Sequence, residues 1–245
     1  MHTYLVRVWL PDRPGALGQV ASRIGAVRGD VVGIEILERG AGRAIDELVV
    51  ALPERDLVDP LVAEISQVDG VDVEDVREVA ADRHDAGLAV LATAVRLVEA
   101  PDTGAVVRTL CEETLADFEG DWAVALRLEP VEAVVEVGAT PTAAWVAAFV
   151  VGSRHLDNGG TEGCPDDVAW ADLAAAGLAV ALGRRGRPFR WRERRQLASL
   201  ARIADRRLTD STPRADRSTS GVHGSADASW AGEGPSVTIG SRPSA

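Results

Sequence analysis

The stretch Tyr4-Leu5-Val6-Arg7-Val8-Trp9-Leu10-Pro11-Asp12-Arg13-Pro14-Gly15-Ala16-Leu17 decides the fold of the N-terminal part of this chain. Its first seven residues alternate, so that every second side chain from Tyr4 to Leu10 lies on one face of a pleated strand. Two prolines and a glycine then make a turn. After the turn, apolar residues recur at helical spacing from Leu17 to Val27. A strand, a tight turn and a helix are therefore expected in that order.

The next sixty residues continue this alternation of strands and helices. Gly29-Asp30 ends the helix, and a strand over 32–36 is joined by the glycine-containing connector 39–43 to a strand over 48–52. A second helix is expected over 57–65 and a fourth strand from Val71 to Val76. The order is βαββαβ, which predicts an α+β, ferredoxin-like module with both helices on one face of the sheet.

The segment Asp12-Arg13-Pro14-Gly15-Ala16-Leu17 resembles the D-x-P-G-x-L loop between the first strand and first helix of ACT domains. The order and length of residues 1–80 agree with that family. The resemblance implies an amino acid as the ligand and a homodimer formed through paired ACT domains. It covers about a third of the chain.

Physical chemistry explains why such a loop suits an amino acid. Gly15 lets a ligand approach the backbone, and the first N–H groups of the helix are free donors at its positive end, where an α-carboxylate is stabilised. Asp12 either accepts a hydrogen bond from the ligand's ammonium group or caps the helix, and capping or turn formation is the favoured reading. Pro14 and Leu17 are expected mainly to fix the turn and the core. The candidate ligand-binding residues are Asp12, Arg13, Pro14, Gly15, Ala16 and Leu17.

The resemblance implies a second set of ligand contacts. In the family, the ligand often lies between the loop of one copy and the second strand of the next, which adds Val32, Gly33 and Ile34 as candidates through their backbone. For Val32 and Ile34 an ordinary place in the strand core is the favoured reading. The other sheet face carries the apolar side chains of Leu5, Trp9, Leu37 and Val49, and another ACT sheet could cover it.

Residues 85–208 predict a second domain. Its expected helices include one whose face carries Leu88, Leu91, Ala92, Val95 and Val98, one over 106–115 and a last one over 197–208. Strands are expected over 122–128, 131–137 and 178–183, while periodicity leaves 142–151 open between a helix and a buried strand. The run 177–182, followed by Pro188-Phe189 and 192–197, resembles the end of a GAF domain, an α/β fold, without any visible nucleotide or chromophore motif.

Neither a catalytic constellation nor a cofactor motif is visible, so we expect no enzyme activity and no cofactor. His155, Asp157, Cys164 and Asp166 lack a recognised metal-ligand spacing, and a solvated loop is favoured over a metal site. Three large aromatics could line a pocket, with core packing favoured: Trp122, Trp145 and Trp170. Ten arginines between Arg184 and Arg207 form a basic island that either binds an acidic surface or, as we favour, is a solvated helix face that answers the acidic charge elsewhere in the protein.

Composition limits the class of partner. The formal charge is −12 with a pI near 4.8, which disfavours nucleic acid and anionic membranes as partners. Two distant cysteines and the lack of a signal-peptide pattern predict a reducing, cytoplasmic location. Residues 209–245 are rich in small and polar residues and are expected to be a disordered tail.

Three functions remain open from the sequence. The first is a cytoplasmic amino-acid-binding sensor, in which ligand at paired ACT domains changes the GAF-like half or a partner. The second is a regulatory or assembly protein that dimerises without a small ligand. The third is an amino-acid metabolic enzyme, for which no catalytic residues are found.

Overall fold

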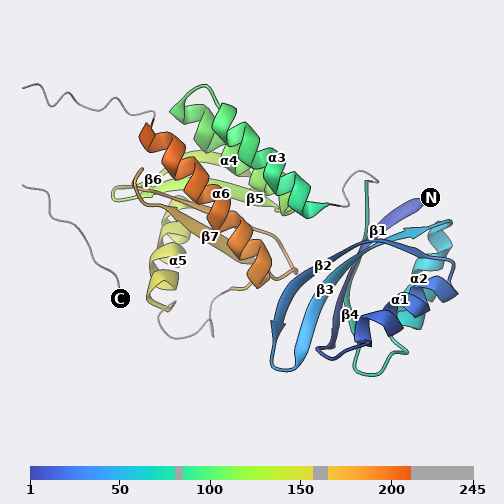
Figure 1. The fold of residues 1–245 in the computed structure, drawn as a ribbon. Helices are drawn as coiled ribbons and strands as arrows, with labels where there is room; N and C mark the ends of the chain where they lie inside the picture. Colours follow the sequence, from blue (N-terminus) through green and yellow to red (C-terminus); the bar gives the residue numbers. More distant parts are fainter. Residues whose placement is uncertain (81–84, 157–164, 211–245) are drawn as a thin grey trace, which may run out of the picture. The chain divides into compact units, whose positions relative to one another are not determined.

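A computed structural model describes residues 1–80, 85–156 and 165–210, and these described residues belong to one compact unit, Met1–Thr212. The compact unit is mixed α/β and holds two four-stranded sheets in which every pairing is antiparallel (Figure 1). No helix in the described ranges is long and apolar enough to cross a membrane. The expected tail lies outside the described residues except for Thr209 and Asp210, which belong to the last helix.

The first sheet has the order β2-β3-β1-β4. The elements in chain order are β1 (His2–Pro11), α1 (Ala16–Ala26), β2 (Asp30–Gly40), β3 (Arg43–Leu52), the 3-10 turn η1 (Arg55–Leu57), α2 (Val58–Ile65) and β4 (Asp72–Val79). This is the predicted βαββαβ order, and both helices lie on one face of the sheet (Figure 1). Their apolar stripes, including Val20, Ile24 and Leu61, pack on Val6 and Val8 of the central strand.

The opposite face of this sheet is also covered within a single chain. Leu5, Leu37 and Val49 are buried there, and Arg7 beside them reaches Glu193 of the last helix. The expected cover by another ACT sheet was therefore wrong, because residues of the second half occupy the face. Covering both faces explains why β1 is buried along almost its whole length.

The second sheet has the order β6-β5-β8-β7. Its elements are α3 (Ala86–Glu99), α4 (Thr103–Asp117), β5 (Trp122–Leu128), β6 (Val131–Gly138), α5 (Ala143–Leu156), β7 (Val168–Leu173), β8 (Leu178–Gly183) and α6 (Trp191–Asp210). The core under α4 and α6 and the core under α5 lie on opposite faces of the sheet. The undecided segment 142–151 is helical, and β7 was not predicted. The GAF resemblance and the domain boundaries stay predictions.

Helix α3 exposes the face that the sequence pattern singled out. Leu88, Leu91, Val95 and Val98 are each more than half exposed. The buried side chains of α3 are Thr93 and Leu97, and Thr93 donates a hydrogen bond to Asp117 at the end of α4, 2.7 Å away. The helix therefore has two apolar faces. The face that the sequence pattern identified is the one that points outward.

The three tryptophans differ in their surroundings. Trp122 is buried and Trp170 packs against the same core, as the core reading predicted. Trp145 is 45% exposed and stacks on Phe149 with the ring centroids 5.8 Å apart, so the core reading was wrong for it.

Trp122 generates a test of this packing. A Cβ atom at Gly183 would lie 2.4 Å from Cε2 and Cζ2 of the indole, so Gly183→Ala forces the ring or the strand to move. We expect it to lower the free energy of unfolding by about 1–3 kcal/mol. At Gly18, a helical position with open space around it, alanine is expected to raise the free energy by about 0.5–1 kcal/mol. Urea unfolding of both variants measures this, and equal stabilities would contradict it.

Candidate functional site

The loop between β1 and α1 has the conformation that the sequence predicted. Gly15 is left-handed, with φ of 87°, and precedes the first residue of α1. The backbone N–H of Asp12 donates to the carbonyl of Gly42 at 2.9 Å, which fixes the loop to the hairpin between β2 and β3. The helix has no side-chain cap. The capping role proposed for Asp12 was therefore wrong, while its place in the turn is confirmed.

The start of α1 offers free donors on an open surface. Within the described part of the chain, the backbone N–H groups of Leu17 and Gly18 donate no hydrogen bond. A Cβ atom built at Gly15 meets nothing within 4 Å, so the space above the loop is open. Free N–H groups at a helix start carry partial positive charge and suit a carboxylate. Arg13 and Pro14 are exposed, whereas Ala16 is buried and Leu17 packs on the core.

Asp46 on β3 is the residue that sequence reasoning missed. Its side chain is buried, and its Oδ1 atom has no hydrogen-bond partner among the residues that the structure describes. Burial raises the pKa of Asp46, and the negative charge of Asp12 raises it further, against the opposing effect of Arg39. Asp12 and Asp46 are thus close enough to repel each other. A ligand ammonium beside them would relieve that repulsion and supply the missing hydrogen bond.

A signal for Asp46 was present in the sequence. Ala44, Asp46 and Leu48 alternate along β3, and their common face is the one that α1 and α2 cover. A carboxylate in the buried phase of a strand is uncommon without a partner. Extending the expected strand 48–52 back by two residues puts Asp46 on this buried face, and that position is the signal.

The second set of candidates lies on the sheet edge. Val32 is 47% and Ile34 is 50% exposed, so the strand-core reading was wrong for both. The register of β2 against β3 shifts between Val31 and Gly33. Because β3 separates β2 from β1 in the sheet, a single chain does not join these residues to the Asp12–Leu17 loop.

A cavity of about 540 Å³ lies elsewhere, over the other face of the first sheet. Leu5, Leu37 and Val49 form its apolar floor, and the first turns of α3 with Phe118 form another wall. Of the candidates named from sequence, Ile34 alone lines it. Burial raises the pKa of Glu35 in its wall, and the adjacent Arg192 opposes that shift.

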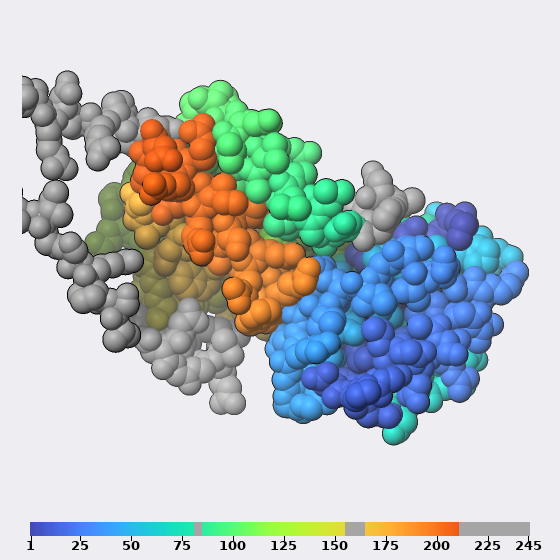
Figure 2. Space-filling model, in the orientation of Figure 1, coloured from blue at the N-terminus to red at the C-terminus, as the bar shows by residue number. Residues whose placement is uncertain are grey.

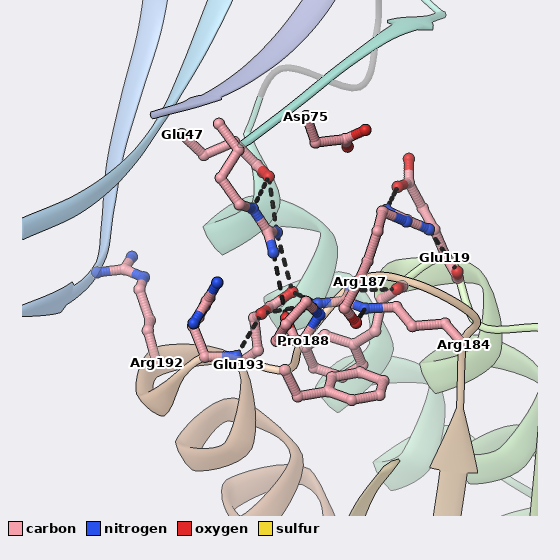
Figure 3. Close-up of polar contacts among 12 residues, drawn as sticks. Glu47, Asp75, Glu119, Arg184, Arg187, Pro188, Arg192 and Glu193 are labelled. Atoms are coloured by element: carbon pink, nitrogen blue, oxygen red, sulfur yellow. Dashed lines mark hydrogen bonds and ion pairs between the residues drawn. The ribbon is translucent and has the colours of Figure 1, made fainter. Parts of the chain in front are cut away.

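A buried ionic cluster adjoins the cavity and joins the two sheets (Figure 3). Arg7 of β1 donates to Glu47 of β3 at 2.8 Å and to the carbonyl of Pro188 at 3.2 Å, and its Nη2 lies 3.5 Å from Glu193. Arg184 donates to both oxygens of Glu193, at 2.7 and 2.9 Å. Burial lowers the pKa of Arg7, but the carboxylates of Glu193 and Glu47 outweigh it and raise the pKa.

Partly exposed ion pairs continue this cluster. Arg187 and Arg77 both contact Glu119, at 2.8 and 2.7 Å. Two further arginines of the basic island contact acids of the first sheet: Arg190 with Glu74 at 2.7 Å, and Arg192 with Glu35. These members of the island answer acidic charge elsewhere in their own chain, as the favoured reading expected, but Arg190 does so in a largely buried pair rather than on a solvated face.

The metal hypothesis gains no support from the described residues. No cluster of three or more ligating side chains occurs in residues 1–80, 85–156 and 165–210. Asp157 and Cys164 lie outside those ranges.

Asp46 generates a prediction about stability and pH. In Asp46→Asn the buried charge is absent, so we expect the free energy of unfolding at neutral pH to rise by roughly 1 kcal/mol. Because the pKa of Asp46 is raised in the folded state, wild type loses stability relative to the variant as pH rises from about 3.9 through that folded pKa. Denaturant unfolding at several pH values measures the difference. Asp72→Asn, at an exposed residue, is the control, and a variant no more stable than wild type contradicts the prediction.

Arg7 generates a prediction about the ionic cluster. Arg7→Met leaves Glu47 and Glu193 short of a buried cation, and we expect a loss of about 3–5 kcal/mol in the free energy of unfolding. Arg55→Met removes an exposed pair with Glu78 and is expected to cost about 1 kcal/mol or less. Chemical denaturation compares the two, and equal losses would show that the cluster contributes no more than a surface pair.

No protein-family model matches the chain, and no curated protein matches it. Among solved structures, the ACT domain of a GTP pyrophosphokinase from Chlorobium tepidum shares 18% identity over 32% of this chain and 100% of that chain, with a TM-score of 0.27. A formyltetrahydrofolate deformylase from Pseudomonas putida KT2440 shares 16% over 32% of this chain and 28% of its own, with a TM-score of 0.26. An unknown protein from Galdieria sulphuraria shares 12% over 85% of this chain and 94% of its own, with a TM-score of 0.30.

Proposed function

We propose that this chain is a cytoplasmic regulatory protein that binds an amino acid at the Asp12–Leu17 loop of paired ACT-type modules and catalyses no reaction. The observation that carries the proposal is the pair of opposite charges at the loop. Free N–H groups of Leu17 and Gly18 lie at the start of α1, and the buried carboxylate of Asp46 lies within electrostatic range of Asp12.

The N–H groups at the start of α1 and the carboxylates of Asp12 and Asp46 match the carboxylate and the ammonium group of an amino acid. The α-carboxylate binds the N–H groups at the helix start, where the backbone of Gly15 leaves the approach open. The ammonium group binds Asp12 and Asp46, which satisfies the Oδ1 atom of Asp46 that lacks a partner within the described ranges. The side chain of the ligand then points away from the loop, so other residues set the specificity.

A second copy completes the site. In the described sheet, β2 pairs only with β3, which leaves its outer edge with unpaired backbone groups. Pairing of the edge strands of two copies places Val32, Gly33 and Ile34 of one copy beside the loop of the other. The exposed side chains of Val32 and Ile34 then become buried around the ligand.

Strand β3 supplies a route from the ligand to the second half. Asp46 and Glu47 are consecutive residues, so their side chains lie on opposite faces of the sheet. Asp46 faces the helix side and the loop, whereas Glu47 accepts hydrogen bonds from Arg7 and Arg77 in the ionic cluster. A ligand that changes the charge balance at Asp46 thereby favours one arrangement of that cluster over another, which is the differential binding that regulation requires.

Thermal melts in the presence of each common amino acid test the proposal. One class of amino acid is expected to stabilise the protein by about 2.7 kcal/mol at 100 times its Kd. Gly15→Val is expected to abolish the shift because its side chain blocks the approach of the carboxylate to the backbone.

The controls separate a blocked site from a strained turn. Gly177→Val places the same side chain at another open, left-handed glycine, with φ of 68°, and must keep the ligand response. Gly15→Asn keeps a residue that tolerates this conformation but still fills the approach, so it must lose the response. If no amino acid shifts the melting temperature of wild type, the sensor function is wrong and the ligand-free assembly function takes its place.

A further inference from the structure

Helix α3 carries an apolar stripe that nothing in the described chain covers. Leu88, Leu91, Val95 and Val98 are 63, 63, 54 and 56% exposed, and α3 lies beside α6 on the face seen in Figure 2. At about 100° per residue the four side chains fall within an arc of about 80°. The inner face of the same helix is already buried against α4 and α6 through Thr93 and Leu97. A helix that is apolar on two faces is normally covered on both.

The spacing of the stripe is that of a helix–helix seam. The intervals of three, four and three residues are the a and d positions of two successive heptads. Gly87, Ala92 and Ala94 flank the stripe, and small side chains there let two helix backbones approach closely. The ten residues Ala86–Val95 carry no charge, in a chain in which 26% of residues are charged.

We propose that α3 docks against α3 of a second copy of this chain, antiparallel, around a two-fold axis that passes between Leu91 and Val95 on the exposed stripe. Such an axis places Leu88 against Val98 of the second copy and Leu91 against Val95. Each contact then pairs a larger side chain with a smaller one, and the stripe is complementary to itself. Closed two-fold dimers are the commonest assemblies of identical chains.

Charge at the two ends of α3 selects the antiparallel arrangement. Asp85 caps the start of the helix by accepting from the N–H of Leu88, so a parallel pair would bring two Asp85 carboxylates together. At the other end, Arg207 donates to the carbonyls of Val98 and Ala100. Antiparallel pairing brings Asp85 of one copy towards the end where Arg207 and Glu99 lie in the other. It also places opposite ends of the helix dipoles side by side.

The size of the stripe predicts how strong this contact is. Fourteen residues make a helix about 21 Å long and about 10 Å wide with its side chains, which projects to roughly 200 Å². A stable interface takes about 800 Å² from each partner. The α3 pairing therefore forms a rapidly exchanging, concentration-dependent dimer, separate from the β2 edge that the proposed ligand site uses.

Sedimentation velocity of the full chain over a wide concentration range tests the proposal. Wild type is expected to move towards a larger species as its concentration rises. Leu91→Glu with Val95→Glu is expected to weaken that association by about tenfold or more, because each charge lies inside the seam. The matched control is Val131→Glu with Val134→Glu, two apolar residues of β6 that are 49 and 45% exposed, and it must associate like wild type.

Cysteine cross-linking tests the register and stays informative if the charged variant unfolds. In a Cys164→Ala background, Leu91→Cys protein is mixed with Val95→Cys protein and oxidised. The native Cys111 does not need to be replaced, because it is buried and burial raises the pKa of its thiol to about 12. The antiparallel seam gives the mixed 91–95 disulfide. Predominant 91–91 and 95–95 disulfides, a wild type that stays monomeric throughout, or unchanged association of the charged variant would each overturn the proposal.

Discussion

The buried charge of Arg7 is the constraint on which the rest of the compact unit depends. Arg7 lies in the middle of the central strand of the first sheet and is 1% exposed. A guanidinium at such a depth must be paired, because moving an isolated charge out of water costs far more than the folding free energy of a domain. Its partners come from two distant parts of the sequence, Glu47 and Glu193. The charge of Arg7 is therefore balanced by a carboxylate of its own sheet and by one of the second half.

That requirement explains the unusual charge pattern of the second half. Glu193 belongs to the first turn of α6 and also accepts from the backbone N–H of Arg190 at 2.7 Å, so it holds the helix start as well as two arginines. Arg184 is held on its other side by the carbonyl of Phe118 at 2.8 Å and lies 4.0 Å over the ring of Phe189. One carboxylate thus fixes the start of α6, the end of β8 and the centre of β1. Buried polar networks of this kind are costly unless every member is satisfied, and they then specify one arrangement.

The order and type of the elements in the first sheet followed from sequence because each has its own local signal. The period of two from Tyr4 to Leu10 and the period of 3.6 after Leu17 are unambiguous, and the prolines with Gly15 mark the turn between them. The cover of the other face of the first sheet had no local signal in the sequence. It depends on Glu193, which is 186 residues away from Arg7 in sequence, and on an arginine-rich helix whose composition also fits a solvated surface. Asp46 was missed for a related reason, since a single carboxylate in a strand becomes informative only when its face is known to be buried.

The outward stripe of α3 shows why periodicity alone does not identify the buried face of a helix. Two sets of residues in α3 repeat at helical spacing. The outer set is 88, 91, 95 and 98, and the inner set is 90, 93, 94 and 97. The first set has the larger side chains. By hydrophobicity alone, the first set is the better candidate for the core. The chain instead buries the smaller set, because α4 and α6 must approach α3 closely and Thr93 reaches Asp117. Close packing selects for size as well as polarity, so the larger side chains stay exposed on α3 in the described structure.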